Sequence, residues 1–238
     1  LLSIYTFMKE TKVKKDQIPI NFSFISNKSF DNYIAGNDNL TIDFLMKFHD
    51  NPLSAIIFLI GKKSSGKSHL CLAIKAMTSK PTVFLNETNI DKEHFDEISR
   101  HELLIIDNID KIIKQSDTEE LLFAAINDFI LNKKHILVTS TLPLDKIKFR
   151  LPDLSSRLKW DQVLTIPELT DEGKIKVLRK NAYERGWDIP NNVCDYIMNH
   201  YKRDLYFLCN CIKHIDQASL SLKKKITIPF IKKIIEYK

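Results

Sequence analysis

The sequence has little of what marks several common classes of protein. Its 238 residues include five glycines and four cysteines, and no apolar run approaches the roughly 20 residues that a membrane-spanning helix needs. The opening residues LLSIYTF lack the basic leader and the small-residue cleavage site of a signal peptide. We therefore expect a cytoplasmic protein without membrane association. Leu1 and Met8 are both compatible with the true start, so residues 1–7 are left out of the fold prediction.

The cysteines lack the spacing of a metal site or a redox pair. Cys209 and Cys211 are separated by one residue, whereas a CxxC redox site or a zinc knuckle needs at least two residues between its cysteines. Together with Cys71 and Cys194, they are predicted to be buried, reduced side chains in a cytoplasmic protein.

Positive charge exceeds negative charge without forming a distinct basic segment. The formal net charge is +6 and the isoelectric point is near 9.0, but the lysines that produce this excess are scattered along the chain. This balance permits weak, non-specific contact with DNA and does not by itself predict it.

Hydrophobic patterning predicts an α/β domain followed by a small helical domain. Continuous apolar runs suit parallel strands that are buried on both faces, and helical patterns separate them. These runs occur at 54–60, 81–86, 103–106, 135–140 and 163–166. After Pro167 only helical patterns remain, at 170–185, 190–200, 203–218 and 227–237. We therefore divide the chain into a tail (1–26), a nucleotide-binding base domain (27–166) and a helical lid domain (167–238).

The helical patterns of the base domain are at 39–48, 67–78 and 118–131. The first of these is amphipathic. Leu40, Phe44 and Phe48 recur at helical spacing, so they are predicted to form its apolar face.

Residues 61–68, GKKSSGKS, match the P-loop pattern G-x-x-x-x-G-K-[ST] between an apolar strand and a helix. The two glycines let the backbone bend so that successive N–H groups point at phosphate oxygens, and the helix N-terminus adds the positive end of its dipole. Lys67 is expected to reach the β- and γ-phosphates, and the Ser68 hydroxyl is expected to ligate Mg²⁺. The predicted phosphate-binding residues are Gly61, Ser64, Ser65, Gly66, Lys67 and Ser68.

The strand at 103–106 ends in Asp107, which fits the second Mg²⁺ ligand of a Walker B strand. The next residue, Asn108, stands near the place where nucleoside triphosphatases usually need a carboxylate to orient and deprotonate the attacking water. An amide can align a water molecule but cannot accept its proton. The sequence therefore predicts slow intrinsic hydrolysis, with Asp110 as a less well-placed substitute.

These motifs together resemble the AAA+ ATPases of the bacterial replication-initiator group, from Gln17 onward. Within this group, GKKSSGKSHL and LLIIDNID make the chain most similar to the Hda family, short homologues of the initiator DnaA that inactivate it. SFDNYIAGNDN (29–39) resembles the initiator box, which implies that Tyr33 and Ile34 lie near the adenine base; ordinary core packing is the alternative for both residues. VTSTLP (138–143) resembles the sensor strand, with Thr141 in place of the usual Asp, which weakens its expected γ-phosphate sensing.

The resemblance also assigns roles to two arginines. LPDLSSRLKW (151–160) resembles the box that carries an arginine finger, which maps onto Arg157. YKRDLYFL (201–208) resembles the lid helix with the second sensor, which maps onto Arg203. Arg157 is then expected to act in trans on a partner's ATP, and Arg203 to fold the lid onto this chain's own nucleotide. Without the resemblance, surface ion pairing would be the simpler interpretation of both.

QIPINF, residues 17–22, contains Pro19 and is predicted to be extended. Extended peptides bind by placing alternate side chains in pockets of a partner. The segment resembles the sliding-clamp-binding motif of the family, and packing on the base domain is the alternative. The implied pocket residues are Gln17, Ile18, Ile20 and Phe22.

The resemblance implies a negative regulator of replication initiation that is associated with the replisome. Such a protein binds ADP or ATP with Mg²⁺, docks on the DNA-loaded sliding clamp and stimulates hydrolysis of the ATP bound to DnaA. One alternative is a DNA-remodelling AAA+ ATPase of the stripped-initiator or helicase-loader type, and another is a P-loop protein that holds nucleotide only as a structural ligand. The sequence is compatible with a monomer and with a homodimer.

Overall fold

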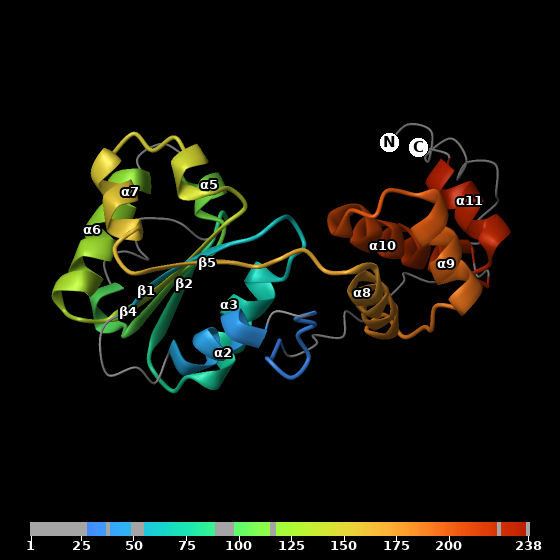
Figure 1. The fold of residues 1–238 in the computed structure, drawn as a ribbon, viewed down its shortest axis with the longest axis horizontal. Helices are drawn as coiled ribbons and strands as arrows, with labels where there is room; N and C mark the ends of the chain where they lie inside the picture. The colour runs from blue at the N-terminus through green and yellow to red at the C-terminus, as the bar shows by residue number, and fades with distance from the viewer. Residues whose placement is uncertain are drawn as a thin grey trace.

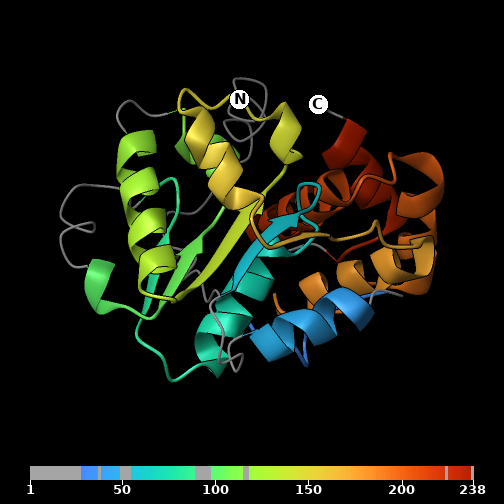
Figure 2. The same cartoon turned by 60° about the vertical axis from the view of Figure 1, so that its left-hand side comes forward.

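The computed structural model describes residues 28–36, 39–48, 55–88, 98–114, 118–222 and 225–236. They form two lobes: one holds a β-sheet with helices on both of its faces, and the other consists of helices (Figures 1 and 2). The predicted clamp-binding segment at 17–22 lies outside the described residues.

The first lobe is built on a five-stranded parallel sheet, in the order β2-β3-β4-β1-β5. Residues of β3 are all buried, as are those of β4, because these inner strands are covered on both faces. The strands are β1 (Ile56–Ile60), β2 (Thr82–Leu85), β3 (Leu103–Ile106), β4 (His135–Ser140) and β5 (Gln162–Thr165). The predicted α/β class with a parallel sheet is confirmed.

Helices pack on both faces of the sheet, each with its own hydrophobic core. On one face lie α2 (Asn39–Phe48) and α3 (Lys67–Met77). On the other lie α5 (Ile109–Ile112), α6 (Thr118–Leu131) and α7 (Pro152–Leu158). Short 3₁₀ turns occur at Ile98–Arg100 and Leu144–Lys146. Neither α5 nor α7 was predicted from the sequence, because helices this short complete too few turns to show a hydrophobic period.

The second lobe contains α8 (Asp171–Tyr183), α9 (Asn191–His200), α10 (Leu205–Leu222) and α11 (Ile228–Glu236) around a core of its own. The predicted helical lid region is confirmed. Helix α10 begins at Leu205, two residues later than expected, because the Asp204 carboxylate accepts the Phe207 N–H at 2.9 Å and thereby caps the helix. Arg203 consequently lies in the irregular segment before the helix and not on it.

Three of the four cysteines are buried, as the sequence predicted. All four cysteines are free, and Cys71, Cys194 and Cys211 are buried, while Cys209 is partly buried. Burial raises the pKa of the Cys71 thiol well above its ordinary value, so this residue stays protonated. Among the described helices, none combines the length and the apolarity needed to cross a membrane.

The prediction that Leu40 and Phe44 form the buried face of α2 together with Phe48 was wrong for the first two residues. Leu40 is 83% exposed and Phe44 is 40% exposed, whereas Thr41 and Leu45 are buried together with Phe48. The ring of Phe48 meets the edge of the His135 ring, with 5.3 Å between their centres, at the start of β4. Leu45 and Thr41 are buried on the same side of the helix as Phe48. Both stripes have helical spacing, and the sequence pattern favoured the more apolar one.

We predict that Leu45→Ala lowers the free energy of unfolding by about 2–5 kcal/mol, because it leaves a cavity under α2. Leu40→Ala on the same helix should change it by less than about 0.5 kcal/mol. Chemical denaturation of both variants beside the parent chain measures the difference. Equal losses for the two variants would contradict the observed orientation of α2.

Candidate nucleotide-binding site

The P-loop connects the end of β1 to the start of α3 at the carboxyl edge of the sheet. Gly61 donates its N–H to the Ser140 carbonyl at 3.1 Å, which fixes the loop beside the end of β4. Gly66 has φ +95° and caps α3, and a Cβ at this position would lie 2.5 Å from the ring of Tyr33. A Cβ on Gly61 would lie 2.4 Å from Ser65 Oγ. Gly66 is therefore required both by its positive φ and by its close approach to Tyr33, and at Gly61 a larger residue would have to displace the Ser65 hydroxyl.

Lys67, the first residue of α3, is buried beneath the loop. Its ammonium donates to the carbonyls of Gly61 at 2.7 Å and Lys62 at 3.1 Å. Burial lowers the pKa of Lys67, while the nearby carboxylates of Asp107 and Asp110 act in the opposite direction. A buried cation is costly unless it is compensated, so this position favours an anion such as a nucleotide phosphate.

The buried carboxylate of Asp107 joins three elements. Its Oδ2 accepts the Ser68 hydroxyl of α3 at 2.5 Å, and its Oδ1 accepts the Thr139 hydroxyl of β4 at 2.6 Å. Thr139 Oγ1 in turn accepts the N–H of Asn108, whose φ of 59° is tolerated by Asn better than by most residues. Ser68 and Asp107 therefore lie side by side, where they could hold a Mg²⁺ ion together with nucleotide phosphates.

Thr139 is a site residue that the sequence analysis missed. It is fully buried, yet its hydroxyl forms hydrogen bonds with Asp107 and Asn108, the two residues that follow β3. The signal that could have identified it is the pair Thr139–Ser140, two hydroxyl residues that end an otherwise apolar strand.

The carboxylate of Asp110 forms hydrogen bonds with Ser140, the last residue of β4, and with Thr141, which follows it. Its Oδ1 accepts the Ser140 hydroxyl and the Thr141 N–H, both at 3.1 Å, and its Oδ2 accepts the Thr141 hydroxyl. Asp110 is buried, so these bonds compensate a charge that water does not reach. The Asp110 carboxylate holds Thr141 in place. Because its oxygens are engaged in these bonds, the carboxylate is poorly placed to accept a proton from water.

Tyr33 braces the P-loop. Its hydroxyl donates to the Ser65 carbonyl at 3.0 Å, and its ring meets the edge of the His69 ring with 5.4 Å between the centres. Nε2 of His69 lies 2.8 Å from the Ser29 carbonyl, and burial lowers the His69 pKa, so the neutral ring donates this bond. The initiator-like segment is thereby fixed to the start of α3. Ile34 is partly buried in the same segment.

The two predicted arginines lie apart from this cluster. The Arg203 guanidinium pairs with Asp171, the first residue of α8, at 2.5 Å, and its Nε donates to the Met198 carbonyl at 3.0 Å. Arg157 lies on α7, across the sheet from α3, with its guanidinium carbon 4.9 Å from the ring centre of Trp160. The structure therefore brings together the P-loop, Asp107 and Thr141, and holds both arginines elsewhere.

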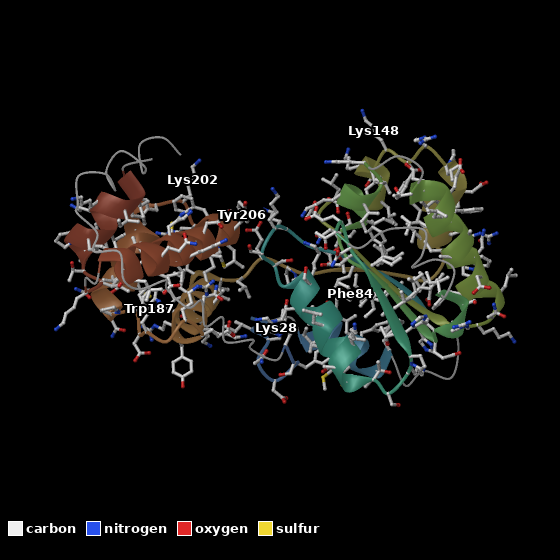
Figure 3. The ribbon with its side chains drawn as sticks, turned by 180° about the vertical axis from the view of Figure 1, so that it is seen from behind. Lys28, Phe84, Lys148, Trp187, Lys202 and Tyr206 are labelled. Atoms are coloured by element: carbon white, nitrogen blue, oxygen red, sulfur yellow. The ribbon has the colours of Figure 1, made fainter. Side chains whose placement is uncertain are left out.

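The P-loop contacts the helical lobe through its two exposed lysines. Lys62 forms an ion pair with Glu168 in the segment after β5. The Lys63 ammonium lies 5.1 Å from the ring centre of Tyr206 on α10. Figure 3 shows Tyr206 on the side of the helical lobe that faces the sheet lobe. The lid thus touches the loop that is predicted to hold the phosphates.

The residues present fit the phosphates of a nucleotide. The Ser65 hydroxyl, within the loop, is buried and has no hydrogen-bond partner in the described part of the chain. Buried polar groups are normally paired, so an unpaired hydroxyl in the loop that also holds the Lys67 ammonium marks a place that a ligand can complete. The N-terminus of α3 adds its dipole at the same point.

Comparison with known proteins shows which families and structures this chain resembles. Residues 171–235 match the family model described as "Hda, lid domain". The helical lobe is similar to the Hda lid domain. The chain is also 29% identical to an uncharacterized protein of Haemophilus influenzae, in an alignment that covers 92% of this chain and 98% of that protein. The resemblance to the Hda family inferred from the sequence is thereby confirmed.

Solved structures support the fold of the whole Hda-like chain. Domain III of DnaA from Thermotoga maritima superposes with a TM-score of 0.74 at 16% identity, covering 92% of this chain and 98% of that one. AMPPCP-bound DnaA from Aquifex aeolicus gives 0.67 at 18% identity, with coverage of 89% and 69%. The Holliday junction branch migration motor RuvB from T. maritima gives 0.66 at 19% identity, with coverage of 90% and 73%. The chain has the AAA+ fold that these proteins share.

We predict that ADP or ATP with Mg²⁺, at a hundredfold excess over its dissociation constant, raises the free energy of unfolding by about 2.7 kcal/mol. Lys67→Ala should abolish this gain, because it removes the buried cation that faces the phosphates. Lys75→Ala, which removes an exposed lysine from the same helix, should retain it. Thermal unfolding with and without nucleotide measures both effects, and an undiminished gain in Lys67→Ala would contradict the assignment.

Proposed function

We propose that this protein binds an adenine nucleotide with Mg²⁺ in its P-loop and acts catalytically on the ATP of a partner AAA+ protein. The observation that carries the proposal is the position of Arg157. It is a cation without a carboxylate partner in the described part of the chain, on the opposite face of the sheet from the P-loop helix. An arginine in this position is available to a nucleotide on another molecule.

The chain's own site favours nucleotide binding over turnover. Asn108 presents an amide where a general base would be needed, and the Asp110 carboxylate is engaged by Ser140 and Thr141. Neither group is well placed to take a proton from an attacking water. We therefore propose that the bound nucleotide acts mainly on the shape of the molecule, through the contacts of Lys62 and Lys63 with the lid region.

Arg157 would supply an arginine finger to the nucleotide site of a partner. An arginine finger stabilises the charge that spreads over the transferring γ-phosphoryl group, and one supplied in trans raises turnover by roughly 10³ to 10⁵. The planar guanidinium can form two parallel hydrogen bonds with phosphate oxygens, which a lysine ammonium cannot reproduce. We assign this role to Arg157.

We propose that the partner is the replication initiator DnaA. The match of residues 171–235 to the Hda lid and the likeness of the fold to DnaA domain III support this choice. The solved DnaA structures with bound AMPPCP show that DnaA binds an ATP analogue, so a DnaA-bound ATP is a suitable target for Arg157. Hydrolysis of that ATP would limit initiation, which makes the protein a negative regulator of replication.

We further propose that residues 17–22, QIPINF, attach the protein to the sliding clamp on DNA. An extended peptide with alternating apolar side chains can add little affinity on its own, but it raises the local concentration of the attached domain. This attachment would bring Arg157 to DnaA only where a clamp has been loaded.

We predict that the parent chain, with clamp and DNA, accelerates ATP hydrolysis by DnaA and that Arg157→Ala loses this effect by roughly 10³-fold or more. Arg150→Ala is the matched control, because Arg150 is an exposed arginine just before the same helix. Released phosphate, measured in single turnovers of DnaA-bound ATP, gives the rates. Intact stimulation by Arg157→Ala would exclude the mechanism, and rapid DNA-stimulated turnover by this chain alone would favour the remodelling ATPase instead.

We predict that Gln17→Ala with Phe22→Ala abolishes recovery of the protein on immobilised sliding clamp, because both anchoring side chains are lost. Asn21→Ala, which changes a residue between the proposed pocket positions, should be recovered like the parent. Equal recovery of the double variant would remove the clamp from the proposed function and leave the role of Arg157 untouched.

A further inference from the structure

The guanidinium of Arg157 is stacked on an exposed aromatic ring. Its carbon lies 4.9 Å from the ring centre of Trp160, three residues along the chain. Trp160 is 61% exposed, which is unusual for so large an apolar side chain. The two side chains line a groove of about 330 Å³ together with Phe123, Asp153 and Ser156. The exposed indole ring of Trp160 is therefore the group that the Arg157 guanidinium contacts at the surface.

The backbone fixes Trp160 on both sides. Its N–H donates to the Arg157 carbonyl at 3.2 Å, which closes the last turn of α7. The next residue, Asp161, accepts the Ile56 N–H at 3.1 Å and so ties the chain to the start of β1. Trp160 lies between these two attachments, one made by its own N–H and one by the side chain of Asp161.

The other end of α7 is fixed as well. The buried carboxylate of Glu119 accepts the N–H groups of Arg150 at 2.7 Å and Leu151 at 2.9 Å, just before the helix begins at Pro152. Because α7 is held at both ends, Arg157 has a fixed Cα, and only its side-chain rotamers remain to be ordered. Ordering a long arginine side chain costs conformational entropy, which a prior contact can reduce.

An aromatic face can hold a guanidinium without neutralising it. A carboxylate partner would compete with an incoming phosphate, and Asp153 lies four residues before Arg157 on the same helix, where such a pair could form. In the described part of the chain Arg157 is instead in contact with the Trp160 ring. Stacking leaves the planar N–H groups at the edge of the guanidinium free to donate to an anion.

We propose that Trp160 is a positioning residue for Arg157: its indole face holds the guanidinium ordered and charged, so that it meets the phosphate oxygens of a partner-bound nucleoside triphosphate in a reactive geometry. This inference rests on the proposed function of Arg157 as an arginine finger. It adds a residue that does not touch the phosphates and whose removal costs rate without loss of partner binding.

The first test asks whether the Arg157 guanidinium contacts the Trp160 ring in this protein without a partner. Trp187→Phe leaves Trp160 as the single tryptophan, because the chain has two. In this background Arg157→Met should change the emission and the quenching of Trp160 fluorescence, whereas Arg150→Met should not. An unchanged emission with Arg157→Met would contradict the contact between the Arg157 guanidinium and the Trp160 ring. Trp187 donates to Asp216 at 3.1 Å, so if its loss unfolds the lid, the difference spectrum between the parent and Trp160→Phe supplies the same reading.

The second test measures stimulation of DnaA-bound ATP hydrolysis as a function of the concentration of this protein. Trp160→Leu should lower the maximal rate by roughly tenfold to a hundredfold at an unchanged half-saturating concentration, because the guanidinium is misplaced but the partner still docks. Trp160→Phe keeps a ring and should restore most of the rate. Tyr183→Leu, which removes an exposed aromatic ring from the lid, is the matched control and should have no effect.

The outcomes separate this inference from the proposed function. A loss with Arg157→Ala but none with Trp160→Leu overturns the positioning role and leaves the arginine finger standing. A raised half-saturating concentration at an unchanged maximal rate also overturns it, because Trp160 would then be a docking contact. No loss with Arg157→Ala overturns the proposed function itself, and the positioning role falls with it, whatever the fluorescence shows.

Discussion

A buried carboxylate at the carboxyl edge of the sheet is the constraint on which the nucleotide site depends. The buried carboxylate of Asp107 needs hydrogen-bond donors, and it takes one from Ser68 of α3 and one from Thr139 of β4. These two bonds fix the start of the P-loop helix relative to the strands. The same region holds Lys67, whose buried ammonium is the opposite charge. The site is thus organised by the need to satisfy charges that water does not reach.

The parallel sheet has a second consequence, because both of its faces must be covered. One face carries α3 and the P-loop, and the other carries α7 with Arg157. A single domain therefore presents the proposed nucleotide site on one side and, on the other, an arginine that has no carboxylate partner among the described residues. This arrangement is what a protein needs if it is to be controlled by its own nucleotide while acting on a second one.

The lid connects to the nucleotide site through charged and aromatic groups near the surface. Lys62 pairs with Glu168, Lys63 lies over Tyr206, and Arg203 is held by Asp171 within the lid. Exposed pairs of this kind are weak, so a nucleotide that competes for these lysines or for Arg203 can shift the lid at little cost. The proposed regulation requires that a phosphate group bind these cations more strongly than the contacts that it replaces.

The sequence by itself determined the strands, the longer helices and the P-loop, because each is encoded in consecutive residues whose backbone preferences and apolar runs act locally. Only the tertiary structure decided which stripe of α2 is buried, that Thr139 completes the site and that Trp160 carries Arg157. These features join residues from different elements or depend on how a helix rotates against the sheet. Their energies arise from long-range packing and charge compensation, which no local pattern specifies.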